Sequence, residues 1–185
     1  KGIAYFNLKD YDAALNCFER LVKRGNKTRD YIWKGDVLFE MDRIHESIES
    51  YHEGIREIYD NEHRYKKNDE LSNLYRALGW KYNQIGEYEL AIQMFEEAIF
   101  FNSNNSNNWN CKAIALENAN ELKEALKFYD IALELNPSSE TILKNKQDCL
   151  NKLKSHFKSK IDVPDSDDSI PGYSILELDE DDIDY

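Results

Sequence analysis

Small residues recur at regular intervals along the chain and organise its pattern of hydrophobic and polar positions. A first column of Gly or Ala is followed twelve residues later by Ala or Ser, and four residues beyond that by an aromatic side chain. The three columns are Gly2, Gly35, Gly79 and Ala113; Ala14, Ser47, Ala91 and Ala125; and Phe18, Tyr51, Phe95 and Tyr129. Because these units recur after 33, 44 and 34 residues, the sequence predicts a stack of helical hairpins.

Apolar residues at helical spacing, separated by short polar breaks, predict the individual helices. The breaks fall at residues 8–10, 41–43, 85–87 and 118–120, and connections this short join antiparallel helices. We expect helices near residues 1–7, 11–24, 29–41, 44–60, 70–84, 88–101, 106–118, 122–135 and 139–157. Ser138 or Ser139 is expected to cap the last helix, which has no partner and whose polar face suits a helix that closes the core.

The third and fourth units carry the residues that resemble the tetratricopeptide repeat, whose pattern is Trp-x2-Leu-Gly-x2-Tyr, Ala-x3-Phe and Pro. In the third unit they are Tyr75, Leu78, Gly79, Tyr82, Ala91, Phe95 and Ala98. In the fourth they are Trp109, Lys112, Ala113, Leu116, Ala125, Tyr129, Ala132 and Pro137. The first unit keeps Gly2, Tyr5, Ala14 and Phe18, and the divergent second unit keeps Tyr31, Gly35, Leu38, Ser47, Tyr51 and Gly54.

This resemblance implies an all-α, right-handed superhelix of about four hairpins with a C-terminal capping helix. The array is expected over residues 1–157, with repeats at about 1–27, 28–69, 70–104 and 105–138 and the capping helix at 139–157. The small residues should let the two helices of a hairpin approach closely, while the aromatic residues fill the space between hairpins. Because the chain begins within its first helix, we expect a parent protein that continues upstream.

The net charge of −12 divides unevenly between the array and residues 158–185. Ten acidic residues and no Lys or Arg follow Lys160, which leaves 26 acidic against 24 basic residues before it. We expect this acidic tail to be flexible or docked. A nearly neutral body without a basic stripe disfavours nucleic-acid binding, including RNA binding by a related helical repeat.

Composition also limits the membrane, redox and catalytic chemistry that we expect. No apolar run reaches the length of a membrane span, and three widely spaced cysteines favour a reducing, cytoplasmic setting. His45 and His52 lie seven residues apart without further ligands, so no metal site is predicted. The sequence shows no arrangement typical of nucleophilic or acid–base catalysis and no Gly-rich phosphate loop. We therefore expect neither an enzyme nor a cofactor.

The resemblance places a peptide-binding surface on the concave face, which the first helix of each hairpin lines. The inward positions lie six, three and two residues before the Gly/Ala column and one, four and five residues after it. They predict a binding set of Arg29, Ile32, Trp33, Asp36, Phe39, Asn73, Arg76, Trp80, Asn83, Asn107, Asn110 and Ile114. Amides pair with a peptide backbone and aromatic rings anchor apolar side chains. The alternative is that Trp33 and Trp80 pack between hairpins and that the excess of Asn has no function.

We therefore expect a non-catalytic scaffold that binds a peptide or helix of a partner protein. The alternative is a regulatory or substrate-recruiting segment of a larger enzyme whose catalytic domain lies outside this chain. We do not expect a chaperone C-terminal carboxylate as the ligand, because the clamp that binds it needs Lys, Asn and Arg at set positions. In the register that starts at Gly35, those positions hold Ile32, Asp36, Ala77, Asn107 and Cys111.

Three further segments have more than one interpretation. About ten extra residues within 55–70 form either an overlong helix with a polar loop or a projecting contact element with Tyr59, Arg64, Tyr65, Lys66 and Lys67. The Asn-rich linker at 102–110 is interpreted as filler in which an Asn caps the next helix. The tail is a disordered solubilising segment, a strand-adding motif around residues 175–182 similar to SUMO-interacting motifs, or a pseudo-ligand docked on a repeat surface.

Overall fold

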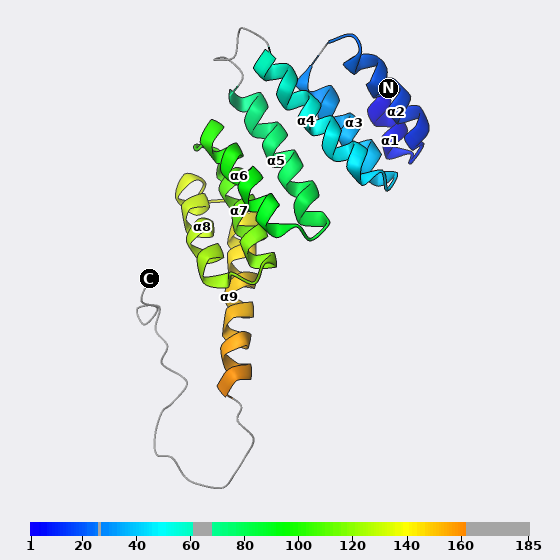
Figure 1. The fold of residues 1–185 in the computed structure, drawn as a ribbon. Coiled ribbons are helices and arrows are strands. Elements are labelled where there is room, and N and C mark those ends of the chain that lie inside the picture. Colours follow the sequence, from blue (N-terminus) through cyan, green and yellow to red (C-terminus); the bar gives the residue numbers. More distant parts are fainter. Residues whose placement is uncertain (26, 61–67, 162–185) are drawn as a thin grey trace, which may run out of the picture.

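The computed structural model describes residues 1–25, 27–60 and 68–161, which form an array of helices joined by short turns (Figure 1). The helices are α1 (Gly2–Asn7), α2 (Tyr11–Val22), α3 (Thr28–Glu40), α4 (Ile44–Asp60), α5 (Asn68–Gln84), α6 (Tyr88–Phe101), α7 (Ser106–Asn118), α8 (Leu122–Leu135) and α9 (Glu140–Ile161). They pack in sequence as the hairpins α1/α2, α3/α4, α5/α6 and α7/α8, and α9 packs on α8. The predicted all-α array of helical hairpins is confirmed.

The last helix is the main departure from the expected helix limits. It begins at Glu140 and ends at Ile161, four residues beyond the limit that we expected for the helix. Ser139 supplies the expected cap, because its Oγ accepts a hydrogen bond from the backbone N–H of Ile142 at 3.4 Å. Residues 162–185 lie outside the described residues, so the interpretations of the tail stay predictions.

The extra residues of the second unit lengthen two helices. Helices α4 and α5 each contain 17 residues, whereas α6 and α8 each contain 14. This agrees with an overlong helix at the end of the second hairpin. Tyr59 lies in the last turn of α4, but the other residues of the suggested contact element, Arg64, Tyr65, Lys66 and Lys67, lie outside the described residues.

Each hairpin turn reverses the chain with the same backbone geometry. One residue in each turn has a positive φ between 60° and 85°: Lys9, Asp42, Gly86 and Asn120. The N–H of the following residue then bonds to the carbonyl oxygen five residues earlier, at N···O distances of 2.8–3.0 Å. This left-handed helix end satisfies carbonyl groups that would otherwise lack a partner, and it explains why four different short sequences make equivalent turns.

The small-residue columns mark the closest approach of the two helices in a hairpin. A Cβ added to Gly35 or Gly79 would lie 2.7 Å from the ring of Tyr51 or Phe95, respectively. Ala91 and Ala125 are fully buried, as are the rings of Tyr51 and Phe95. The Gly/Ala column therefore makes room for the aromatic residue of its own hairpin.

The Asn-rich linker is not filler at Asn108, and that interpretation is wrong there. The side chain of Asn108 is fully buried, and its Nδ2 donates to Ser72 Oγ at 2.9 Å and to the carbonyl oxygens of Ala98 and Asn102 at 3.0 Å. These bonds connect α5, α6 and α7. Asn105 does cap α7, because its Oδ1 accepts from the N–H of Asn107 at 3.1 Å.

Candidate functional site

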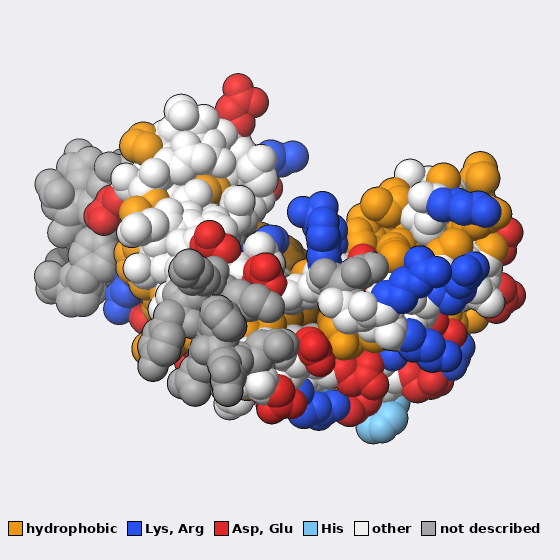
Figure 2. Space-filling view, turned by 90° about the horizontal axis from the view of Figure 1, so that it is seen from above, with side chains coloured by type: hydrophobic (Ala, Val, Ile, Leu, Met, Phe, Trp, Pro, Cys, Tyr) orange, Lys and Arg blue, Asp and Glu red, His pale blue; other side chains and the backbone are white. Residues whose placement is uncertain are grey.

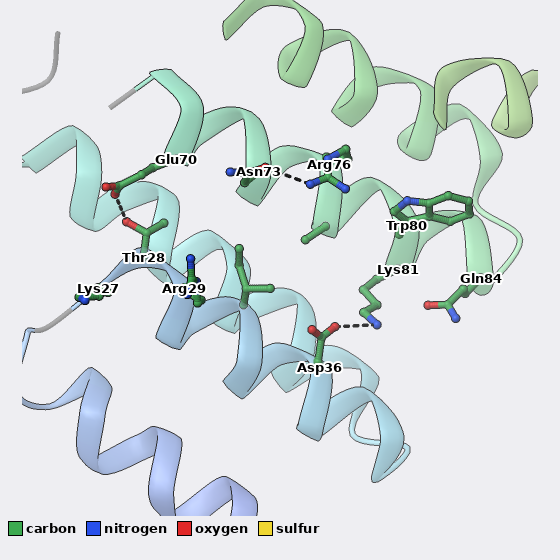
Figure 3. A pocket seen from close by; sticks show the side chains of 12 residues that line it. Lys27, Thr28, Arg29, Asp36, Glu70, Asn73, Arg76, Trp80, Lys81 and Gln84 are labelled. Carbon is green, nitrogen blue, oxygen red and sulfur yellow. Dashed lines mark hydrogen bonds and ion pairs between the residues drawn. The ribbon is translucent and has the colours of Figure 1, made fainter. Parts of the chain in front are cut away.

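Helices α3 and α5 line a groove with a volume of about 840 Å³, which we call the α3–α5 groove (Figure 3). Lys27, just before α3, and four residues of α3 form one side: Thr28, Arg29, Ile32 and Asp36. The residues of α5 that form the other side are Glu70, Asn73, Arg76, Ala77, Trp80, Lys81 and Gln84. The space-filling view shows the molecule hollowed between its two ends, with Lys and Arg side chains projecting at the hollow (Figure 2).

Half of the predicted binding set meets in this groove. The six residues are Arg29, Ile32, Asp36, Asn73, Arg76 and Trp80. Of the other six lining residues, Ala77 and Gln84 lie at inward positions of the repeat register, whereas sequence reasoning missed Lys27, Thr28, Glu70 and Lys81. Helical spacing contains a signal for Lys81, because it lies four residues after Ala77 and eight after Asn73, on the same face of α5.

The two predicted aromatic residues of α3 lie elsewhere. Trp33 stacks on Phe18 with ring centroids 5.7 Å apart and meets Phe6 edge-on at 5.6 Å, so it packs against the first hairpin. The position of Trp33 therefore agrees with the alternative that it packs between hairpins. Phe39 does not line the groove, but its ring centroid lies 4.5 Å from Nζ of Lys81, which does.

Two predicted amides bond to amides on the neighbouring inner helix. Asn83 of α5 accepts a hydrogen bond from Nδ2 of Asn118 at 3.0 Å, and Asn110 of α7 accepts one from Nδ2 of Asn145 at 3.1 Å. Both Asn83 and Asn110 are buried. Each pair spans 35 residues of sequence, and each joins one repeat to the next.

The remaining two predicted residues lie on α7, away from the α3–α5 groove. Ile114 lines a second pocket of about 420 Å³ with residues of α7, α8 and α9, including Glu117 and Lys152. Asn107 lies in the first turn of α7 and is exposed, outside the lining of both pockets. The predicted set is therefore divided among one groove, one smaller pocket and the contacts between repeats.

The acidic groups of the α3–α5 groove already have partners. Asp36 Oδ1 accepts a hydrogen bond from the Tyr51 hydroxyl at 2.8 Å and forms an ion pair with Nζ of Lys81 at 2.8 Å. Glu70 accepts a hydrogen bond from the Thr28 hydroxyl. Burial, followed by the neighbouring Asp36 carboxylate, raises the pKa of Tyr51, so this tyrosine stays a hydrogen-bond donor.

Three cationic side chains of the groove have no ion pair within the described parts of the chain: Lys27, Arg29 and Arg76. Arg76 Nη2 donates to Asn73 Oδ1 at 2.9 Å, while its Nε is buried without a hydrogen-bond partner. Lys27 and Arg29 act on the nearby Asp30, whose pKa is nevertheless raised because burial outweighs them. The lining of the groove is therefore cationic after its internal pairs are counted.

The described residues offer little for metal or nucleophilic chemistry. Within residues 1–25, 27–60 and 68–161 no group of three or more His, Cys, Asp or Glu is placed to hold a metal ion. Burial raises the pKa of the Cys111 thiol to about 11, although Arg76 and a hydrogen bond with Trp80 act in the opposite direction. This thiol is therefore protonated at neutral pH and unsuited to nucleophilic attack. In the same part of the chain, no helix has the length and apolar character of a membrane span.

These features define an all-α helical-repeat protein with a groove between two of its inner helices. The family model of the tetratricopeptide repeat matches residues 1–24 and 72–105, which contain the first and third units. This match, with the repeated columns and hairpins, shows that the chain contains tetratricopeptide repeats. No curated protein matches the sequence.

Solved structures share the fold at low sequence identity. A MamA structure from MSR-1 is 21% identical, with a TM-score of 0.58 over 86% of both chains. The first tetratricopeptide repeat domain of Spaghetti (RPAP3), bound to the HSP90 peptide SRMEEVD, is 20% identical, with a TM-score of 0.57 over 69% of this chain and 96% of that chain. The second domain of human RPAP3, in complex with the HSP70 peptide SGPTIEEVD, is 21% identical, with a TM-score of 0.52 over 63% of this chain and 88% of that chain.

Proposed function

We propose that this chain is a non-catalytic protein-interaction module that binds an extended peptide or a helix of a partner protein in the α3–α5 groove. The observation that carries the proposal is the convergence of Arg29, Ile32, Asp36, Asn73, Arg76 and Trp80 on one open groove. The groove places amides beside apolar groups: Asn73 and Gln84 offer donors and acceptors for a peptide backbone, and Ile32 and Trp80 offer apolar surface.

Peptide complexes among proteins of the same fold support this proposal. The two RPAP3 structures contain peptides of HSP90 and HSP70. The present groove differs from a clamp for C-terminal carboxylates, because Ile32, Asp36 and Ala77 occupy clamp positions and line it. We therefore propose an internal segment of the partner as the ligand.

The proposal extends to setting and regulation. Buried thiols at Cys111 and Cys149, without a disulfide, favour a reducing compartment such as the cytoplasm. The ten carboxylates that follow Lys160 complement the cationic groove, so the tail is a candidate pseudo-ligand that competes with the partner. The alternative role, as the regulatory or substrate-recruiting segment of a larger enzyme, would use the same groove. It differs only because the segment would be joined to a catalytic domain outside this chain.

The proposal is tested by replacing Trp80, which supplies the largest apolar surface of the groove. We expect Trp80→Ala to reduce the recovery of partner proteins from a lysate, measured by quantitative mass spectrometry after affinity capture of the full chain. Circular dichroism melts of both proteins separate lost binding from lost folding, because Trp80 also meets Phe95 edge-on at 5.9 Å.

The matched control is Lys127→Ala, since Lys127 lies on α8, away from the groove, and is 47% exposed. Equal losses in Trp80→Ala and Lys127→Ala, or full recovery with a folded Trp80→Ala variant, would contradict a binding site in the α3–α5 groove.

A further inference from the structure

We infer that the α3–α5 groove selects a partner segment in which an acidic side chain pairs with Arg76 and Arg29 and an adjacent apolar side chain packs on Trp80. The inference rests on the proposed function and deepens it, because it names the ligand as an Asp- or Glu-containing peptide. The acidic side chain of the ligand is assigned to Arg76 and Arg29. Neither belongs to the clamp for C-terminal carboxylates in the register that starts at Gly35, whose positions in this groove hold Ile32, Asp36 and Ala77.

The charges of the lining favour an anionic ligand. Both of its carboxylates have partners within the protein: Asp36 is bonded by Tyr51 and Lys81, and Glu70 by Thr28. Lys81 is the only lysine or arginine of the lining that forms an ion pair within the described parts of the chain. A ligand with an acidic side chain would therefore meet three unpaired cations, whereas Asp36 is neutralised by Lys81 and the charged carboxylate of Glu70 is held by Thr28.

Arg76 is the side chain best placed to bind this acidic group. Its guanidinium has lost water at the buried Nε without gaining a protein acceptor there, and its one hydrogen bond goes to the neutral amide of Asn73. A partly desolvated guanidinium attracts a carboxylate more strongly than one in bulk water, and its planar fork suits the two carboxylate oxygens. Arg29 lies on α3, across the groove from Arg76, and is exposed (Figure 3).

An apolar subsite lies one helical turn from Arg76. Trp80 follows it by four residues on α5, and Ala77 and Ile32 lie in the same lining. The edge-on contact with Phe95 at 5.9 Å holds the Trp80 ring in place. An acidic residue and an apolar residue that are close in the ligand would therefore occupy Arg76 and Trp80 together.

A displayed library of short random peptides tests this selectivity whatever the identity of the partner. The full chain is expected to enrich peptides that place Asp or Glu close to an aromatic or large aliphatic residue. The probe for affinity is the most enriched peptide, labelled with fluorescein and measured by anisotropy. We expect Arg76→Gln to weaken its binding about tenfold or more, because a charge-assisted hydrogen bond is lost. Arg76→Lys should restore only part of the affinity, since it keeps the charge without the fork.

The control is Arg56→Gln, the same substitution at an exposed arginine of α4 that pairs with Glu49 outside the groove. Enrichment of acidic peptides, together with a loss in Arg76→Gln but not in Arg56→Gln, supports the inference. If enriched peptides lose affinity in Trp80→Ala but not in Arg76→Gln, the groove binds peptides and the acidic subsite is wrong. If folded protein enriches no peptide at all, the proposed function itself fails.

A second form of the full chain, with the ten acidic residues after Lys160 changed to Asn or Gln, distinguishes a partner's acidic segment from the chain's own tail. Equal affinity of both forms for the acidic probe supports a site open to a partner. Binding that appears only in the amide form overturns the assignment to a partner and assigns the same subsite to the tail.

Discussion

The junction between α3 and α5 and the junction between α7 and α9 are built on the same hydrogen-bonded group. In the first, Asp36 accepts from the Tyr51 hydroxyl and pairs with Lys81. In the second, Glu117 accepts from the Tyr129 hydroxyl at 2.7 Å and pairs with Lys152. Each acid–tyrosine–lysine group joins the two helices of one hairpin to the next inner helix, so both junctions are held by equivalent contacts.

The residues beside this group make the two junctions differ. Three residues before the Gly/Ala column, α3 and α5 carry Ile32 and Arg76, which line the groove, whereas α7 carries Asn110, which bonds to Asn145 of α9. In the junction between α7 and α9 an amide pair occupies this position, whereas in the junction between α3 and α5 the residues at the same position line the groove. The repeat register therefore places a side chain on the inner face, and the neighbouring helix decides whether that side chain forms a contact within the protein.

The largest loss of stability is expected when the packing of the α7/α8 hairpin is disrupted. Ala125 is fully buried in the column of α8, so Ala125→Arg should lower stability by more than about 3 kcal/mol through overpacking and an unpaired buried charge. Circular dichroism melts measure the loss. Lys127→Arg on the same helix is the control, since Lys127 is exposed, and a melting temperature of Ala125→Arg within a few degrees of wild type would refute this packing.

The two acid–tyrosine–lysine groups are compared directly by removing each hydroxyl. Tyr129→Phe and Tyr51→Phe should each cost about 1.5–3 kcal/mol, because a hydrogen bond to a charged group is lost. The cost should be larger for Tyr129, since the Glu117 side chain is 9% exposed and that of Asp36 is 28% exposed.

Urea unfolding gives both values for these two variants, with Tyr88→Phe as the control because Tyr88 has no such carboxylate partner in the described structure. Equal and negligible losses in Tyr51→Phe and Tyr129→Phe would contradict the structural role of these groups.

Alkaline pH should weaken both junctions together. Burial and the neighbouring carboxylates raise the pKa of Tyr51 and Tyr129 above the value of 10.0 for a free tyrosine. The folded state then keeps protons that the unfolded state loses, so this stabilisation is complete below pH 10 and falls above it by up to about 1.4 kcal/mol per pH unit for each tyrosine. Stability curves measured above pH 10 should be shallower for the Tyr51→Phe/Tyr129→Phe variant than for wild type; parallel curves would exclude this linkage.

The smallest expected effect concerns the amide pair of the second junction. Asn145→Ala removes the donor to Asn110 and should cost about 1 kcal/mol, because Asn110 is buried and loses its partner. Gln147→Ala is the control on the same helix, since Gln147 is exposed and bonds only to Asn151 of α9. Chemical denaturation measures the difference, and peptide binding in the α3–α5 groove should not change in either variant.

Most of the fold could be predicted from the sequence because its signals are local. Residues such as Asp42 and Gly86 adopt the left-handed conformation that ends a helix, and each lies in a predicted break. The columns also predicted which positions are buried between helices, as at Ala91 and Phe95. The end of α9 was missed because residues 158–161 carry no helix-stopping signal before the tail begins.

The candidate site could be predicted only in part. Arg76 and Trp80, which the repeat register assigns to the inner face, line one groove, because side chains on one helix face recur at fixed spacing. The register could not decide between a groove position and packing for Trp33, which stacks on Phe18, and it did not foresee that Asn108 would be buried beside Ser72. Those contacts depend on the neighbouring hairpin, and no spacing within a single unit contains them.

The hairpins, their turns and the inward face of each inner helix follow from local sequence signals, because helix periodicity and chain reversal are properties of neighbouring residues. Which inward side chains are occupied by contacts depends on how consecutive hairpins pack on one another. The partners Asn83 and Asn118, like Asp36 and Lys81, are separated by more than thirty residues and meet only when consecutive hairpins stack. Stacking uses the amides of α7 for contacts between repeats and leaves the cations of α3 and α5 beside an open groove.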